Sequence, residues 1–271
     1  MPIDTRSRMT RGMETTACAA GLCLALGLTV SSSVSAGEAE AKSTLKAMSD
    51  YLAAQKSLSL SYDNSFEVVS KDKQKLQVAA SGKLNMSRPD KLRATRTGGF
   101  ANVEMVFDGK TFTILGKDAN IYAQADVPGT VDQMVDEIRD KYHKSIPGAD
   151  LLLSNVYDEL MRDVVEVKDL GSGVIGGKEC DHFAFRAKEL DWQIWIAQGD
   201  RPYPCRYVIT TTKVDMAPQY TLTVSDWKAG DEVAMDDFTF KAPEGAKKLE
   251  AKELKALKAL SDMPSNFSTG D

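Results

Sequence analysis

The chain has few of the side chains on which metal and catalytic sites depend. Its 271 residues include two histidines, His143 and His182, and four cysteines. Cys18 and Cys23 lie in an N-terminal apolar run that we expect to be removed, so two cysteines remain for the folded protein. A structural zinc site takes four ligands, mostly Cys and His. We therefore predict neither a metal site nor a cofactor.

The sequence also lacks the motifs of common enzyme classes. It contains no G-x-S-x-G, P-loop or H-E-x-x-H pattern, so hydrolase and kinase templates find no support. The run GSGVIG at 171–176 matches the dinucleotide pattern, but it leads into a strand-like stretch and is interpreted as a turn. We predict no catalytic residue, and an enzyme that uses Asp181 and His182 is the least favoured alternative.

A basic block is absent as well. Without the first 36 residues the chain has 31 basic and 37 acidic residues, a net charge of −6. Proteins that bind nucleic acid usually carry a basic patch for the phosphates. We therefore predict no nucleic-acid partner.

The N-terminus has the pattern of a secretory signal peptide. Three arginines precede an apolar run at 17–30, and the small residues Val-Ser-Ala follow at 34–36. The run is shorter than the roughly 20 residues that span a bilayer. We expect residues 1–36 to be removed between Ala36 and Gly37, which places the protein in the periplasm.

The exported chain keeps Cys180 and Cys205, which we expect to pair as a disulfide because the periplasm is oxidising. Both lie in the stretch ECDHFAFRAKELDWQIWIAQGDRPYPCRYVIT at 179–210, which also holds two tryptophans. Apolar residues occupy both faces of the strand-like DWQIWI. Two readings remain open for this stretch: burial under helices, or the wall of a ligand cavity.

The hydrophobic period divides the mature chain into helical and strand regions. Leu45, Met48 and Leu52 recur at helical spacing, and from Leu58 the period changes to two. A long hairpin and several short strands follow, one pair joined by Asp-Gly at 108–109, which favours an antiparallel meander.

Two helices are expected between this meander and a second run of strands. Thr130 is a candidate cap for the first and Asp150 for the second, whose apolar stripe is either core or a lid over a cavity. A last helix is expected around Leu249 to Leu260, before a polar tail at 261–271. Residues 37–260 are expected to form a single domain.

Several segments resemble an uncharacterised family of predicted periplasmic proteins in bacteria. They are FDGKTFTIL, IYAQADVPGT, IPGADLL, GGKECDHFAFR, DWQIWIAQGDRPYP, PQYTLTVSDW and FTFKAPEGAKKLE. That family is similar in fold to the lipoprotein-carrier superfamily, which includes LolA, LolB and mycobacterial lipid-binding lipoproteins. The resemblance implies an α+β fold, a curved antiparallel sheet or incomplete β-barrel with helices over its concave face, and an apolar ligand.

We therefore expect a non-enzymatic periplasmic protein that binds a lipid, an acyl chain or a lipoprotein, as a carrier or chaperone, and that contacts envelope membranes transiently. The alternative is an envelope interaction or scaffold protein whose half-barrel is filled by its own side chains. Candidate cavity residues are those with apolar side chains on the expected inner faces of the strands and on the lid: Leu84, Met86, Met105, Phe107, Phe112, Ile114, Phe183, Phe185, Trp192, Ile194, Ile196, Leu152, Leu153 and Leu160.

Overall fold

The computed structural model describes residues 32–98, 101–142, 146–234, 236–250 and 267–268. Its strands form one sheet with the order β12-β6-β5-β4-β3-β2-β1-β11-β10-β9-β8-β7, and β13 pairs with the end of β1. The strands are β1 Ser57–Ser70, β2 Lys75–Ser87, β3 Lys91–Gly98, β4 Ala101–Phe107, β5 Thr111–Gly116, β6 Ile121–Asp126, β7 Val164–Ile175, β8 Lys178–Ala187, β9 Leu190–Ala197, β10 Pro204–Thr211, β11 Gln219–Ala229, β12 Lys247–Leu249 and β13 Phe267–Ser268.

The sheet consists of two antiparallel meanders that meet at the pair β1–β11. Strands β1 to β6 form the first meander and β7 to β11 the second, as the two runs of alternating residues predict. The sheet is curved and does not close, since β12 and β7 lie at its two ends. The expected α+β fold with an incomplete antiparallel barrel is confirmed. The parallel pair β12–β6 is the exception within the described strands.

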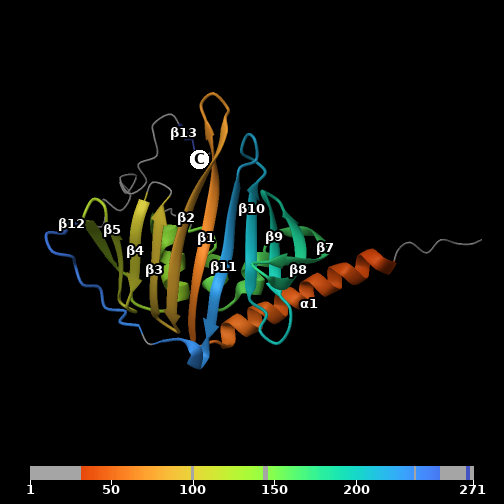
Figure 1. Cartoon of the computed structure of the whole chain (residues 1–271), viewed down its shortest axis with the longest axis horizontal. Helices are drawn as coiled ribbons and strands as arrows, with labels where there is room; N and C mark the ends of the chain where they lie inside the picture. The colour runs from red at the N-terminus through yellow and green to blue at the C-terminus, as the bar shows by residue number, and fades with distance from the viewer. Residues whose placement is uncertain (1–31, 99–100, 143–145, 235, 251–266, 269–271) are drawn as a thin grey trace, which may run out of the picture.

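The α-helices pack against one face of this sheet. They are α1 Ser32–Ala54, α2 Val131–Tyr142 and α3 Val156–Met161, with short 3₁₀ turns η1 Ala149–Leu152 and η2 Gly230–Glu232. Figure 1 shows the green helices behind the central strands and α1 running along the β7–β8 end of the sheet. No helix in the described part of the chain has the length and hydrophobicity needed to cross a membrane.

Helix α1 covers the second meander. Its side chains Leu45, Met48 and Leu52 are fully or almost fully buried, which confirms the helical period seen in the sequence. They pack with Phe183 and Ile194 of the sheet in one hydrophobic cluster, called here the α1 cluster. The expected cleavage site falls inside α1, before the first of these buried positions.

Helix α2 covers the first meander. Thr130 Oγ1 accepts a hydrogen bond from the Gln133 amide at 3.3 Å, and the Gln133 side chain accepts one from the Thr130 amide at 2.8 Å. This reciprocal pair is a capping box, so the predicted cap at Thr130 is confirmed. Met134 and Ile138 of α2 pack in a second hydrophobic cluster, called here the α2 cluster, over strands β1 to β6.

The second expected helix is divided in the structure. The backbone of Leu153 is extended, with φ −70° and ψ 162°, between η1 and α3. The Ser154 amide is held by the Asp132 carboxylate at 3.2 Å. Within η1, before this break, neighbouring residues point in different directions: Leu151 packs in the α1 cluster and Leu152 packs against the α2 cluster.

The described C-terminal residues 233–234 and 236–249 cross the outer face of the first meander as an extended strap. The helix expected to begin around Leu249 is not formed at that residue. Leu249 lies in β12, which pairs in parallel with Ala123 of β6. Beyond residue 250 the expected helix lies outside the described residues. In the expected polar tail, Phe267 and Ser268 form β13.

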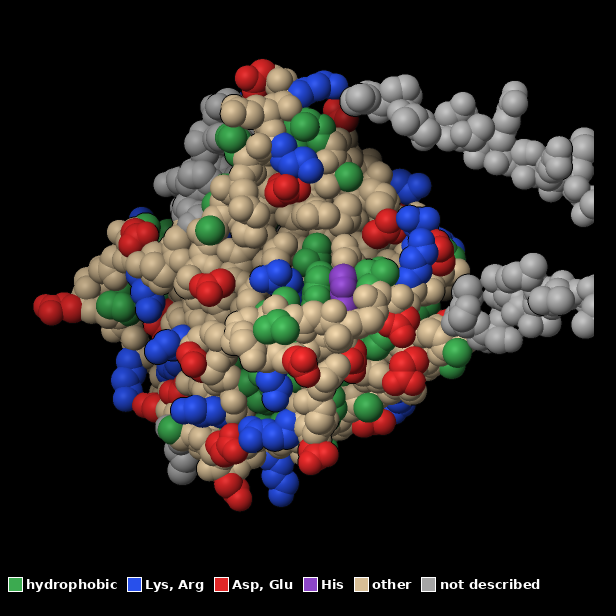
Figure 2. Space-filling view, turned by 45° about the vertical axis from the view of Figure 1, so that its right-hand side comes forward, with side chains coloured by type: hydrophobic (Ala, Val, Ile, Leu, Met, Phe, Trp, Pro, Cys, Tyr) green, Lys and Arg blue, Asp and Glu red, His purple; other side chains and the backbone are tan. Residues whose placement is uncertain are grey.

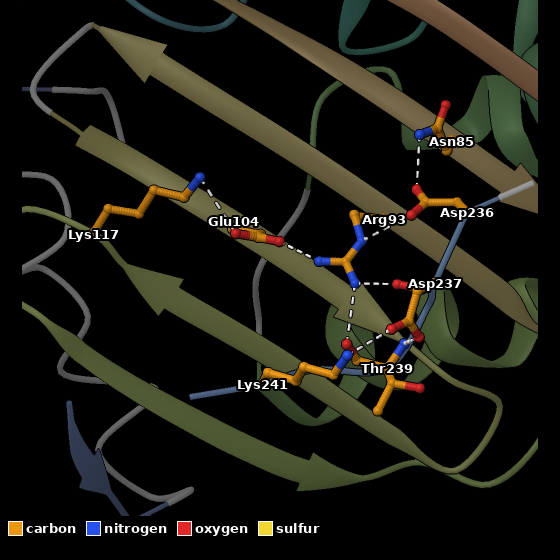
Figure 3. A network of polar contacts seen from close by, with 8 residues as sticks. All are labelled: Asn85, Arg93, Glu104, Lys117, Asp236, Asp237, Thr239 and Lys241. Carbon is orange, nitrogen blue, oxygen red and sulfur yellow. Dashed lines mark hydrogen bonds and ion pairs between the residues drawn. The ribbon is translucent and has the colours of Figure 1, made fainter. Parts of the chain in front are cut away.

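Arg93 of β3 holds this strap, as Figure 3 shows. Its guanidinium lies 3.5 Å from the Asp236 carboxylate, donates to the Thr239 carbonyl at 3.1 Å, and is paired with Glu104 of β4. Asp236 also accepts a hydrogen bond from Asn85 of β2 at 2.7 Å. The strap therefore covers the outer face of β2 to β4 through polar contacts, and the opposite face of these strands stays available for the helices.

Candidate functional site

An apolar pocket of about 590 Å³ lies on the inner face of the sheet, between the central strands and the α2–η1 segment. Its walls come from β1 to β5, β10 and β11, and its cover from α2, residues 146–149, Leu151 and Leu152. The pocket lies where the α1 and α2 clusters meet. Trp227 of β11 packs against both clusters and lines the pocket.

The cover is attached to the sheet by polar contacts. Arg88, in the turn between β2 and β3, donates to the carbonyls of Leu152 at 2.9 Å and Leu153 at 3.3 Å. Tyr207 of β10 donates its hydroxyl hydrogen to Asp150 of η1 at 3.0 Å. These hydrogen bonds join the η1 segment to both meanders of the sheet and fix the position of the cover relative to the strands.

Asp150 is an unusual anchor because its carboxyl group is buried. Burial raises the pKa of Asp150 above its ordinary value, and the nearby Glu159 carboxylate raises it further, whereas hydrogen bonds from Tyr207 and the local backbone lower it. The other carboxyl oxygen, Oδ1, is buried without a hydrogen-bond partner among the described residues. Burial also raises the pKa of Tyr207 well above its ordinary value, so Tyr207 remains the donor.

Asp150→Asn is therefore expected to stabilise the protein more at neutral pH than in acid. A raised pKa in the folded state means that folding favours the protonated acid, so wild-type stability falls as pH rises from the unfolded pKa of about 3.9 through the folded value. Asparagine stays neutral throughout. Urea unfolding of both proteins at about pH 4 and about pH 7 measures the difference. An equal effect at both pH values would contradict the assigned pKa direction.

The structure divides the residues expected to line a cavity into two groups. Leu84, Met105, Phe112 and Leu152 line the pocket. The others lie outside its lining: Met86, Phe107 and Ile114 belong to or pack against the α2 cluster, Leu153 is buried beside η1, and Phe183, Phe185, Trp192, Ile194, Ile196 and Leu160 belong to the α1 cluster.

The tryptophan-rich strand β9 is therefore part of a packed core, and this differs from the expected cavity wall. Trp192 stacks on Phe185 with ring centroids 3.8 Å apart, and both are at most 2% exposed. Helix α1 packs over this face, and the lining of the pocket includes no residue of β8 or β9. Burial under helices, the alternative left open by the sequence, applies to this half of the sheet.

The outer face of the same strands carries His182. Its Nε2 lies 3.0 Å from the Gln193 side-chain oxygen, and its ring stacks on Trp195 at 3.8 Å. Burial lowers its pKa below the ordinary value. The one described histidine appears in Figure 2 at the surface between hydrophobic side chains. It lies outside the pocket lining, and His143 lies outside the described residues.

The predicted disulfide is present. Cys180 of β8 and Cys205 of β10 are bonded across the end of β9, and both are buried against Ala197. Within the described residues, no group of three or more His, Cys, Asp and Glu side chains is arranged to hold a metal ion.

Sequence reasoning missed the polar part of the lining. Tyr62 and Asn64 of β1, Arg96 of β3 and Tyr220 of β11 all border the pocket. The alternation that begins at Leu60 continues through Tyr62 and Asn64, so the period of two was sufficient to place them on the inner face. Because these side chains are polar, the expectation of an apolar cavity did not include them.

Comparisons with known proteins add a family and a set of similar folds. No curated protein matches the chain. Lipoprotein LppX of Mycobacterium tuberculosis is 14% identical, with 73% of this chain and 100% of that chain covered and a TM-score of 0.42. LprF of Mycobacterium bovis is 12% identical, with 74% of this chain and 98% of that chain covered and a TM-score of 0.45. A LolA superfamily protein of Nitrosomonas europaea is 10% identical, with 70% of this chain and 94% of that chain covered and a TM-score of 0.33.

A family model described as a predicted periplasmic protein, DUF2092, matches residues 41–251. This range includes the pocket, the disulfide and the whole of both meanders. The resemblance inferred from the sequence is confirmed, and the chain belongs to the DUF2092 family of predicted periplasmic proteins.

Proposed function

We propose that this periplasmic chain is a non-enzymatic binding protein that takes up a lipid, an acyl chain or the acyl chain of a lipoprotein, as a carrier or chaperone. The observation that carries the proposal is the pocket of about 590 Å³ on the inner face of the sheet. Pockets that hold small ligands are mostly apolar and measure about 300–1,000 Å³. A half-barrel filled entirely by its own side chains would not have such a space.

The lining supports an apolar ligand over a polar one. Leu84, Met105 and Phe112 present hydrocarbon from the sheet, and Met134 and Leu152 present it from the cover. Each methylene group of a ligand that leaves water contributes about 0.8 kcal/mol to binding. An acyl chain therefore gains affinity along the whole apolar wall without any specific polar contact.

An envelope scaffold without a ligand is the second candidate, and the filled half of the sheet favours it. Over β8 and β9 the inner face is packed by α1, with Phe183 and Ile194 at most 1% exposed. If the pocket over the first meander also closes in solution, the protein acts through its surface. A larger side chain at Ala94 distinguishes the two candidates because it tests whether the space is empty.

Ala94→Phe is expected to fill the pocket and weaken probe binding without loss of stability. Ala94 lines the pocket from β3 and is 4% exposed, so a phenyl ring there occupies ligand space. Exclusion of two or three ligand methylenes weakens binding by roughly tenfold or more. The measurement is titration of lipid-free protein with a fluorescent fatty-acid probe, together with urea unfolding.

The matched control is Thr95→Phe, which places the same ring at the next position of β3 on the outer face. It should bind the probe as the wild type does. If Ala94→Phe instead destabilises the protein by the 1–3 kcal/mol typical of an overpacked core, and the wild type binds no probe, the binding function is refuted and the scaffold candidate replaces it.

A further inference from the structure

The two ends of the pocket differ in chemistry, because successive rows of the sheet carry different residues. One cross-strand row on the inner face consists of Leu60, Leu84, Ala94 and Met105, which are register partners on β1 to β4. Two residues further along the strands the row becomes Tyr62, Gly82 and Arg96, with Val224 of β11 and Val103 of β4 on either side. Polar groups from β1 and β3 therefore enter the pocket wall over one repeat of the strand.

Gly82 allows Tyr62 to lie flat across β2. A Cβ at position 82 would come within 2.5 Å of the Tyr62 ring, so a side chain there would displace it. The tyrosine ring crosses over the glycine and donates its hydroxyl hydrogen to the Thr95 carbonyl at 2.8 Å. Burial raises the pKa of Tyr62 to about 12, so the hydroxyl stays protonated. Tyr62 forms a fixed wall beside Arg96.

Asn64 and Tyr220 continue the polar end from β1 and β11. The Asn64 amide nitrogen lies 3.4 Å from the Tyr220 hydroxyl oxygen, while the Asn64 carbonyl oxygen is buried without a hydrogen-bond partner among the described residues. The side-chain amide of Asn64 can rotate by about 180°, which exchanges the positions of its NH2 group and its oxygen, because the two groups are similar in size. Asn64 therefore has hydrogen-bonding capacity that the described protein groups do not use.

Arg96 gives this end its positive charge. Its guanidinium lies over the Phe66 ring, 5.7 Å from the centroid. A guanidinium has five N–H donors in a planar array that suits a carboxylate, so it can hold an anion in addition to contacts with the protein. Glu67 is the other charged residue among those that line the pocket, and it is engaged by Lys75 at 3.1 Å and by the Gln219 amide at 2.8 Å.

We propose that the polar end, consisting of Tyr62, Asn64, Arg96 and Tyr220, holds the carboxylate head of a single-chain amphiphile whose tail lies along Leu84, Met105 and Phe112. The inference rests on the proposed function and specifies its ligand class: a long-chain carboxylic acid in its ionised form. Arg96 selects the anionic head, and the apolar rows accept the chain. A neutral amphiphile of equal length gains affinity from the apolar rows only.

Competition between two ligands of equal chain length tests this head-group site. Hexadecanoate and hexadecanol are each titrated against a neutral apolar probe, diphenylhexatriene, bound to the lipid-free protein. A charge-assisted hydrogen bond contributes enough to make the acid bind about tenfold more tightly than the alcohol. Arg96→Met should remove this preference by weakening acid binding alone, and Arg96→Lys should retain part of it.

Arg206→Met is the matched control. Arg206 of β10 also lies over an aromatic ring, 5.8 Å from the Trp195 centroid, but on the outer face and away from the pocket lining. Its loss should leave the preference for the acid unchanged. Circular dichroism and thermal unfolding identify the variants that remain folded. If Arg96→Met does not remain folded, Arg96→Gln is measured in its place.

The outcomes separate the head-group site from the binding function itself. Equal affinity of the wild type for acid and alcohol would overturn the head-group site and leave the proposed function standing. Tenfold preference that persists in folded Arg96→Met would overturn the role of Arg96. Absence of probe binding to the wild type would overturn both proposals.

Discussion

Ile194→Glu is expected to unfold the protein at neutral pH. Ile194 is 0% exposed in the α1 cluster, and its register partners Phe183 and Tyr207 are also buried. An unpaired carboxylate at such a position costs several kcal/mol, and the lost apolar contacts add about 2–5 kcal/mol. Because a typical domain is stable by about 5–15 kcal/mol, the folded state should be lost or reduced to a minority. Circular dichroism and urea unfolding measure this.

Gln193→Glu is the matched control for this prediction. Gln193 precedes Ile194 on β9 but faces outward, where its side-chain oxygen lies 3.0 Å from His182 Nε2. A glutamate of the same size keeps this acceptor and remains near solvent, so the variant should stay folded. If Ile194→Glu instead keeps wild-type stability and loses probe binding, β9 lines a ligand site and its assignment to a packed core is wrong.

The contrast between β9 and β2 shows what the sequence could predict about the site. Alternation placed Trp192, Ile194 and Ile196 on the inner face of β9 and Leu84 on the inner face of β2, and both assignments agree with the observed burial. Period alone does not say which helix covers which strands. Helix α1 fills the inner face over β8 and β9, whereas α2 and η1 leave space over β1 to β5. The pocket depends on this division.

Local signals were reliable where one contact decides the conformation. The Thr130 capping box and the Asp-Gly turn between β4 and β5, where Gly109 has φ 87°, need only neighbouring residues. Leu249 was misassigned because its strand exists only by pairing with Ala123, which is distant in the sequence. The division of the second helix likewise depends on Asp132 of α2, which binds the Ser154 amide.

Polar residues inside the pocket were the hardest to predict, for a physical reason. Arg96 lies in the sequence KLRATRT, where alternation gives Leu92, Ala94 and Arg96 one face and makes the arginine look like the exposed end of a strand. It borders the pocket because β3 is central, with β2 and β4 on either side. The role of a cationic side chain on the inner face of a sheet can be inferred only when the elements that enclose that face are known.

Loss of the disulfide is expected to destabilise the protein by about 3.5 kcal/mol while leaving the pocket unchanged. Cys180 and Cys205 are 25 residues apart, and in the chain-entropy model a loop of this length gives about that stabilisation. For a chain of this size the melting temperature should fall by roughly 10 °C.

The two cysteines pack with Ala197 in a cluster separate from the α1 and α2 clusters. The double variant Cys180→Ala/Cys205→Ala should therefore bind the fatty-acid probe with wild-type affinity below its melting temperature. Urea unfolding of this variant and of oxidised wild type that begins at Gly37 gives the difference in stability, and thiol titration of the denatured oxidised wild type should find no free thiol. Two titratable thiols would show that the bond does not form in the exported protein. A stability loss accompanied by weaker probe binding would instead mean that the disulfide also supports Pro204, the first residue of β10, which lines the pocket.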